Sequence, residues 1–250
     1  MSKREAATAD PAARPQGGRK QSGRRRLSVV QRRDEIVSAT LRLLSTTPAS
    51  QLSIDDIAEA AGASRALIYH YFRTKERLFA SAVRSACDDL QSRLVLPDVH
   101  PFEKVQYAAR AYLEFAEQRQ GDFVALLRGA ARTGGEPDEL AGLVEQTRQF
   151  IVDLVITGIG IERPSAVLRA SLRGWVAMME VISLEWLEHQ QLTRDQVRRL
   201  IANQLGAVLV AAAAEDEELS AVYARLLATA DVDRLPPWVR ALARPTGAGA

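Results

Sequence analysis

One segment carries the strongest structural signal in the sequence, Gly62-Ala63-Ser64-Arg65-Ala66-Leu67-Ile68-Tyr69-His70-Tyr71-Phe72-Arg73-Thr74-Lys75-Glu76-Arg77-Leu78-Phe79. The Ser and Thr hydroxyls of this segment can cap two helices, one over about 65–71 and one that starts at residue 75 and runs towards residue 94. On the first helix, three apolar side chains are expected to face the core: Leu67, Ile68 and Phe72. The polar and small side chains lie towards the other side. The segment predicts a short amphipathic helix with a polar front.

Two further helices are predicted upstream of this segment. Apolar residues at helical spacing indicate a helix over about 31–45, which Pro48 ends. Ser53 opens a short second helix, because its hydroxyl can cap and Asp55 and Asp56 suit the positive end. Gly62 stops that helix, since glycine tolerates a positive φ. Two short helices joined by a glycine-containing turn, packed on a longer first helix, are the helix-turn-helix pattern.

The polar front of the 65–71 helix carries groups that can read DNA. Arg65 can place its guanidinium on guanine O6 and N7, and Ala66 can meet a thymine methyl group. Tyr69 and Tyr71 can donate to phosphate oxygens, and Lys75 adds positive charge beside a helix N-terminus. The same spacing also suits an ordinary amphipathic helix with aromatic core residues, because helical hairpins are common in proteins that do not bind DNA.

The segment resembles the TetR/AcrR family of bacterial transcription regulators. The residues in register with the signature of that family are Ser64, Ala66, Ile68, Tyr69, Tyr71, Phe72, Thr74, Lys75 and Leu78, and residues 53–61 are similar to its second helix. Ala63 replaces the usual valine, a small loss of buried volume. The resemblance covers about residues 32–85. The candidate DNA-binding residues are Ser53, Ser64, Arg65, Ala66, Tyr69, His70, Tyr71 and Lys75.

The resemblance implies a homodimer whose two reading helices enter successive major grooves of a palindromic operator. It also implies a C-terminal body that binds a small molecule and changes the spacing of the two heads. Geometry favours a dimer too, because one short helix reads few base pairs. We expect a repressor that the effector releases from DNA. The same domains would also serve a transcriptional activator or a corepressor-dependent regulator, in which the direction of control is reversed.

The composition is typical of a folded protein with a basic N-terminal segment. The 250 residues are 47% hydrophobic and 26% charged, with one cysteine, so a disulfide framework is excluded. No apolar run is long enough to cross a bilayer, and the N-terminus shows no secretory signal, so a cytoplasmic protein is expected. Residues 1–33 hold ten Lys and Arg against Glu5 and Asp10. This excess of positive charge favours a polyanion as the partner of the N-terminal segment, although a tail that only aids solubility would have the same composition.

The remainder of the chain reads as helix, which makes the fold class all-α. Helices are expected over about 102–118, 122–131, 138–159, 164–189, 194–214 and 216–229, with one break at Gly121. The expected organisation is a disordered basic arm (1–30), a helix-turn-helix DNA-binding domain (31–80), a helical effector-binding and dimerisation domain (81–235) and a flexible tail (236–250).

Two sets of apolar residues are candidates for the dimer interface and the effector pocket. The resemblance implies that the last two long helices, about 164–189 and 194–214, form the interface, and the candidates there are Ala202, Leu205, Gly206, Leu209 and Val210. The pocket candidates are Phe115, Phe123, Leu126, Leu127, Phe150, Leu154, Trp175, Met178, Met179, Ile182 and Trp186. Both sets also suit a plain intramolecular core.

The scarcity of charge on these stripes favours a lipophilic small effector. A His-Tyr-Phe head with a Trp-rich eighth helix is similar to regulators that sense fatty acyl compounds, including acyl-CoA thioesters, while drugs and antibiotics remain alternatives.

Enzyme chemistry finds little support in the sequence. The three histidines, at 70, 100 and 189, lie far apart, and no metal-ligand spacing is present, so we expect no metal and no cofactor. Glu185 and His189 share a helix face, a spacing typical of a solvated polar pair. Cys87 lacks a nearby histidine, which favours a structural thiol. The competing class is therefore a helical adaptor without specific DNA binding.

Overall fold

The computed structural model describes residues 28–130 and 139–230 of the chain. All regular elements in these ranges are α-helices, as the sequence predicts. They are α1 (Val29–Thr46), α2 (Ile54–Ala61), α3 (Arg65–Phe72), α4 (Lys75–Arg93), α5 (Pro101–Gln118), α6 (Gln120–Ala130), α7 (Glu139–Ile159), α8 (Ala166–His189), α9 (Arg194–Ala213) and α10 (Glu217–Thr229). Each predicted helix agrees with an observed one to within two residues at either end. Almost all of the predicted basic arm and the whole tail lie outside the described residues.

The helices begin where capping side chains satisfy their first N–H groups. Ser28, Ser53 and Thr193 each form a reciprocal capping box with the residue three positions on. Ser64 and Thr74 accept from the backbone of the third residue of α3 and α4 in the same way. Because these caps are local, the sequence alone could place the helix starts.

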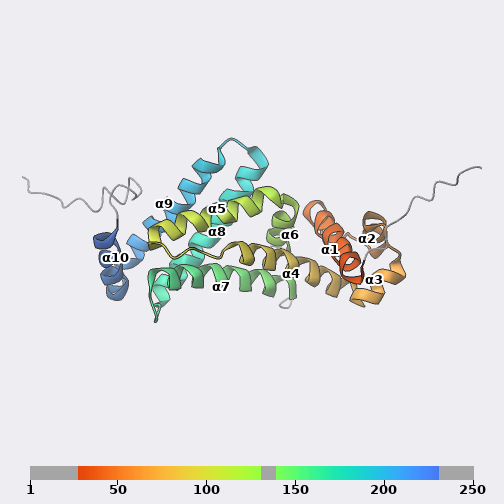
Figure 1. Cartoon of the computed structure of the whole chain (residues 1–250), viewed down its shortest axis with the longest axis horizontal. Helices are drawn as coiled ribbons and strands as arrows, with labels where there is room; N and C mark the ends of the chain where they lie inside the picture. The colour runs from red at the N-terminus through yellow and green to blue at the C-terminus, as the bar shows by residue number, and fades with distance from the viewer. Residues whose placement is uncertain (1–27, 131–138, 231–250) are drawn as a thin grey trace, which may run out of the picture.

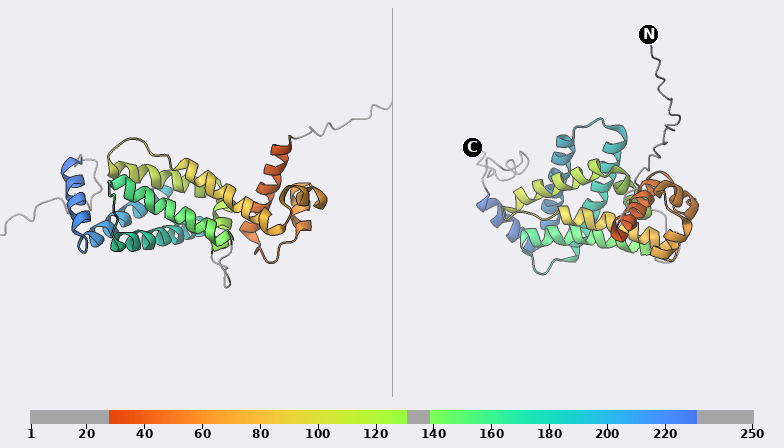
Figure 2. Two further views of the ribbon diagram at one scale, coloured as in Figure 1. Left: turned by 90° about the horizontal axis from the view of Figure 1, so that it is seen from below. Right: turned by 45° about the vertical axis from the view of Figure 1, so that its right-hand side comes forward.

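The molecule has a small head and a longer body (Figure 1). Helices α1–α3 form the head at one end, and α10 lies at the opposite end. Figure 2 shows from two further sides that α4 runs out of the head and into the body, where it lies along α7. The head is held by α1, which packs on α4 and α6 and buries Ile36, Ala39 and Leu41. Burial of such side chains is the main source of stability at this joint.

The sequence predicts a break between two helices at Gly121. In the structure this residue instead lies inside α6, near its start. A Cβ atom at this position would lie 3.4 Å from the hydroxyl oxygen of Ser45 on α1. This distance is an ordinary van der Waals contact, so a methyl group would fit, and the low helix propensity of glycine costs little here because Gly121 is only the second residue of α6.

The described helices contain none that is both long enough and apolar enough to cross a membrane.

Candidate DNA-binding surface and effector cavity

The turn between α2 and α3 is fixed by hydrogen bonds on both sides. Gly62 adopts φ 55°, and the N–H groups of Gly62 and Ala63 donate to the carbonyls of Glu59 and Ala58 at 3.1 and 2.9 Å. This is the Schellman arrangement, which ends α2 with a left-handed residue. The Arg32 guanidinium on α1 donates to the carbonyl of Gly62. The turn is therefore tied to the first helix of the head.

The helix α3 has a buried back and an exposed front, as its sequence predicts. Ile68 and Phe72 are buried, whereas Leu67 is only half-buried. The exposed front carries Arg65, Ala66, Tyr69 and His70, and Tyr71 is half-buried at its side. The front faces solvent rather than another part of the described chain, so it is available to a partner.

Arg65 is held in position before any partner arrives. Its Nη1 lies 2.9 Å from Oδ2 of Asp55 on α2, and its guanidinium carbon lies 5.8 Å from the centre of the Tyr69 ring. The Tyr69 hydroxyl and the Asp55 carboxylate together raise the pKa of Arg65. Both side chains of the ion pair are more than half exposed, so this pair orients Arg65 more than it stabilises the fold.

The remaining DNA-binding candidates surround α3. The Ser53 hydroxyl donates to Asp56 at 2.7 Å while accepting from the Asp56 backbone, and these contacts with Ser53 lower the pKa of Asp56. The Ser64 hydroxyl accepts from the backbone of Leu67 at 3.2 Å. Both serines therefore cap helix N-termini in the DNA-free protein. Lys75 begins α4, and its ammonium lies 5.2 Å from the centre of the Phe79 ring.

An apolar cavity lies in the body, between the α4–α5 connection and helices α5, α7, α8, α9 and α10. Its free volume is about 70 Å³, and its lining runs along α5 from Pro101 to Tyr112. The eleven steps from residue 101 to residue 112 rise roughly 16 Å along the helix, so the cavity is long and narrow. Within the described part of the chain, Lys104 is the only charged residue that lines it.

Three of the predicted pocket residues line this cavity: Leu154, Trp175 and Met179. Five others are buried elsewhere in the core and do not line it: Phe115, Phe123, Leu126, Leu127 and Trp186. Phe150, Met178 and Ile182 are half-buried and also lie outside the lining. The sequence reading missed the contribution of α5 and α10. On α5 the signal was present, because Pro101, Lys104, Val105, Ala108, Ala109 and Tyr112 follow helical spacing along one face.

The hydroxyl of Tyr223 in the cavity wall is buried without a hydrogen-bond partner in the described part of the chain, whereas the buried hydroxyl of Tyr112 lies towards Ser183 and the Arg148–Glu180 ion pair. Burial raises the pKa of both phenols, that of Tyr223 to about 12. A buried hydroxyl without a partner costs free energy, and a ligand with an oxygen or nitrogen atom can supply that partner. At the outer end, the Lys104 ammonium lies 3.8 Å from Oδ1 of the fully exposed Asp98.

Most of the residues predicted for the dimer interface are buried inside the protomer rather than exposed to a partner. Ala202, Leu205, Gly206 and Leu209 are buried within the protomer, and Leu205 and Leu209 line the cavity. The reason is the tight packing of α9 on α8 and α5, which uses this side of α9. Val210 is half-buried. The solvent side of the helix pair, called here the α8–α9 outer face, carries instead the exposed small and apolar residues Val167, Ala170, Gly174, Ala177, Val181, Leu200, Ala207 and Ala211.

The residues weighed for catalysis lie in structural settings. Glu185 and His189 form an exposed pair at 3.3 Å. The Cys87 thiol is buried and donates to the carbonyl of Leu143 at 3.8 Å, and burial raises its pKa. No group of three or more potential metal ligands is found in residues 28–130 and 139–230.

Comparison with known proteins identifies the family. Residues 36–82 match the model described as "Bacterial regulatory proteins, tetR family". Residues 101–229, more than half of the chain, match the model described as "Tetracyclin repressor-like, C-terminal domain". The chain belongs to the TetR family. It is therefore a DNA-binding transcriptional regulator, and the proteins it resembles are regulators rather than enzymes.

Solved structures of TetR-family proteins share the whole architecture. A tetR-family transcriptional regulator from Streptomyces coelicolor is 30% identical, with an alignment that covers 87% of this chain and 97% of that one at a TM-score of 0.73. A TetR-like transcriptional regulator from Rhodococcus sp. RHA1 is 19% identical over 72% of this chain and 96% of that one, with a TM-score of 0.61, which shows a common fold.

Curated relatives include the nucleoid occlusion factor SlmA from several bacteria. The protein from Yersinia enterocolitica is 32% identical over 119 residues, which are 46% of this chain and 59% of that protein. The protein from Shewanella amazonensis is 27% identical over 149 residues, 56% of this chain and 76% of that protein. This chain thus spans about three fifths of the length of the first SlmA sequences it matches.

Proposed function

We propose that this TetR-family protein is a repressor that binds a palindromic operator as a homodimer and is released by a lipophilic small molecule. The observation that carries the proposal is the long apolar cavity in the body, joined to the exposed front of α3 by one continuous helix. We further propose that the protein works on chromosomal DNA in the cytoplasm, with no membrane partner and no cofactor.

The DNA-binding surface of each protomer would be the exposed front of α3 and the helix starts around it. Arg65 and Ala66 would contact base edges, while Tyr69, His70, Tyr71 and the N-termini capped by the two serines would meet backbone phosphates. Lys75 would neutralise a further phosphate. Two such heads related by a two-fold axis read half-sites about 34–36 Å apart, or a multiple of that spacing.

The α8–α9 outer face is the surface best suited to the partner protomer. Val181 and Val167 are 66% and 39% exposed, and small residues follow between them at three- and four-residue spacing along α8. Small residues let helices approach closely, and exposed apolar side chains gain free energy when a second copy covers them. A dimer formed through this face is therefore the proposed operator-binding species.

Helix α4 offers the mechanical link between effector and DNA. Lys75 begins α4 at the DNA-facing end of the head, and Leu94, which directly follows it, lines the cavity. Its 19 residues span roughly 28 Å. A ligand that displaces the cavity end of α4 also turns the head, because α1 packs on α4. Operator and effector would then compete through one conformational equilibrium.

The cavity supports an effector with a slender apolar chain and an acidic end. Its narrow shape suits a single hydrocarbon chain, and Lys104 at its outer end can pair with an anion, since its present partner, Asp98, is fully exposed and 3.8 Å away. The unpartnered phenol of Tyr223 can donate to a carbonyl or carboxylate oxygen of the ligand. Fatty acids and acyl-CoA thioesters have this chemistry, and they are the proposed class ahead of drugs and antibiotics.

The experiment begins with selection of an operator from a random duplex library by the full-length protein. Operator affinity is then measured by fluorescence anisotropy with and without decanoate, palmitate or palmitoyl-CoA, and quenching of tryptophan fluorescence reports ligand binding independently. We expect one of these ligands to weaken operator binding about 5–150-fold. Tighter operator binding would instead identify a corepressor. Unchanged affinity at saturating ligand would contradict the coupling.

The acidic end of the effector can be tested in the same assay. Lys104→Gln should weaken binding of the free fatty acid about tenfold and leave binding of its methyl ester unchanged. Arg110→Gln is the control, because Arg110 lies on the same helix but pairs with Glu114 outside the cavity lining. Equal losses for the acid and the ester would assign Lys104 to the structure of the cavity mouth rather than to the head group.

A further inference from the structure

A second basic surface lies beside α3, in a groove that shares only Tyr71 with the DNA-binding candidates from the sequence. Four arginines line the groove, Arg33 of α1, Arg73 of the α3–α4 turn, and Arg77 and Arg84 of α4. Tyr71 and Phe72 form part of its wall, and its volume is about 390 Å³. We call this feature the arginine groove. Among the residues that the structure describes, Glu139 at the start of α7 is the only acidic one in its lining.

The charge of the arginine groove is largely uncompensated. Most arginines in the described ranges have a carboxylate within 4 Å, but Arg33, Arg73 and Arg77 have none. Arg84 approaches Glu139 only to 3.6 Å, and both side chains are more than half exposed. Such a concentration of unpaired guanidinium groups raises the local positive potential and attracts an anionic partner.

The backbone at Arg73 is strained in a way that points to its side chain. Arg73 has φ 62° and ψ −44°, and the N–H of Thr74 donates to the carbonyl of Phe72 across it at 2.7 Å. This is a γ-turn with positive φ, a rare and strained conformation for a residue with a Cβ atom. Glycine would adopt it without that cost. An arginine at this position is consistent with a role for its guanidinium.

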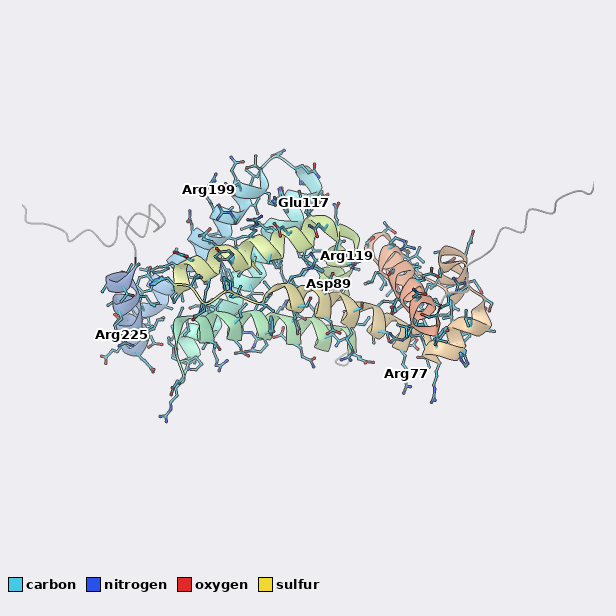
Figure 3. All side chains as sticks on the ribbon, in the orientation of Figure 1. Arg77, Asp89, Glu117, Arg119, Arg199 and Arg225 are labelled. Atoms are coloured by element: carbon cyan, nitrogen blue, oxygen red, sulfur yellow. The ribbon has the colours of Figure 1, made fainter. Side chains whose placement is uncertain are left out.

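The groove is continuous with the proposed DNA-binding surface. Tyr71 belongs to both, and Arg77 lies two residues after Lys75 on α4. Figure 3 shows Arg77 projecting from the underside of the head, at the opposite end of the molecule from Arg225 on α10. We propose that the arginine groove binds backbone phosphates of DNA that flank the operator half-site, outside the base pairs that α3 reads. This inference rests on the proposed operator binding.

Duplex DNA is the partner that the spacing favours. Arg77 and Arg84 are seven residues apart on one helix, which corresponds to roughly 10 Å, so the two guanidinium groups can meet different phosphates of the DNA backbone. Planar guanidinium groups bind phosphate oxygens in pairs of hydrogen bonds, and an adjacent tyrosine hydroxyl can donate to a third oxygen. The contacts carry no sequence information, so they extend the footprint without changing the sequence that is read.

The test uses the full-length protein and two duplexes, the selected operator alone and the same operator with eight unrelated base pairs added at each end. We expect wild-type protein to bind the extended duplex more tightly and with a steeper salt dependence. The double variant Arg77→Gln/Arg84→Gln should lose this advantage, with a decrease in the slope of log K against log salt of about 3.6 per dimer, from four phosphate contacts at ~0.9 each. Arg225→Gln, at the far end of the molecule, should behave as wild type.

Three outcomes would overturn the proposal. The double variant could match wild type on both duplexes, or it could lose the same slope on both, which would place its contacts inside the half-site. Unchanged DNA binding with loss of binding to poly-glutamate would assign the groove to an acidic protein segment. If the protein selects no operator, this result contradicts the proposed function but not the proposed role of the arginine groove. A 40-base-pair duplex of arbitrary sequence then tests the groove, and there too the double variant must show the lower slope.

Discussion

The guanidinium of Arg65 on α3 lies 2.9 Å from the carboxylate of Asp55 on α2, so an acidic side chain holds the foremost base-reading candidate in the DNA-free protein. The pair spans the turn of the helix-turn-helix unit, and both side chains are more than half exposed. An anion at this position does two things. It orients Arg65, and it competes with DNA for the same guanidinium.

The first prediction follows from that competition. Asp55→Asn should tighten binding to arbitrary duplex DNA several-fold and reduce the preference for operator, because Arg65 becomes free to pair with any phosphate. The measurement is anisotropy on operator and arbitrary duplexes at one salt concentration. Asp195→Asn is the matched control, since Asp195 is a similarly exposed acid in ion pairs on α9, away from the head. An unaltered preference in Asp55→Asn would show that Arg65 does not exchange partners.

A second prediction separates base reading from phosphate contact. Lys75→Ala should lower the slope of log K against log salt by about 1.8 per dimer, from two phosphate contacts at ~0.9 each, on every sequence alike. Arg65→Ala should instead weaken operator binding on the order of tenfold or more per half-site and relax one base preference. Binding to a panel of single-base operator variants distinguishes the two. Equal losses on all variants for Arg65→Ala would make it a phosphate contact.

The sequence predicted the helices because their signals are local. Ser53, Ser64 and Thr74 cap helices in the structure at the positions expected from sequence, and the exposed front of α3 follows from the same periodicity. Gly121 shows the limit of such reasoning, because α6 begins one residue before this glycine and packs there against α1, a contact between residues distant in sequence.

The residues that line the cavity were harder to predict, because residues along one face of a helix contact several different neighbouring helices. Trp175, Met179 and Trp186 share a stripe on α8, but Trp186 donates its indole N–H to the carbonyl of Leu192 at 3.0 Å and packs away from the cavity. Likewise, periodicity shows that one side of α9 is apolar without showing whether it faces its own protomer or a partner. Leu205 and Leu209 face inward.

The third prediction concerns the α8–α9 outer face. Val181→Asp should convert the proposed dimer into monomers at micromolar concentration, because a charge buried in an apolar interface loses its hydration without gaining a partner. Sedimentation velocity measures the change, and operator affinity should fall with it since the half-sites are no longer bound together. Val95→Asp is the control, as Val95 is 82% exposed in the α4–α5 connection. Retention of the dimer in Val181→Asp would place the interface elsewhere.

A fourth prediction uses the single cysteine as a probe of the α4–α7 packing. Burial raises the pKa of Cys87, so its reactive thiolate should form only above the usual pH range of a free thiol. At pH 8 iodoacetamide should therefore modify the native protein at least 100-fold more slowly than the protein unfolded in urea. Mass spectrometry follows the reaction at one site. Rapid labelling of native protein would mean that α4 and α7 separate readily, and that the thiol is more than structural.

The last prediction tests the cavity through its backbone. Gly158 of α7 lines the cavity, and a Cβ atom there would meet nothing within 4 Å. Gly158→Ala should stabilise the fold by about 0.5–1 kcal/mol, because alanine has the higher helix propensity. Gly158→Leu should fill the narrow cavity, so that decanoate and palmitate bind at least tenfold more weakly while operator affinity in their absence stays the same.

Gly142 provides the matched control for the leucine substitution. It lies on the same helix, also has open space around its Cβ position, and does not line the cavity. Gly142→Leu should therefore keep both ligand binding and operator release. If Gly158→Leu also keeps operator release, the effector acts through another site, because a branched side chain and a hydrocarbon chain cannot occupy so narrow a cavity together.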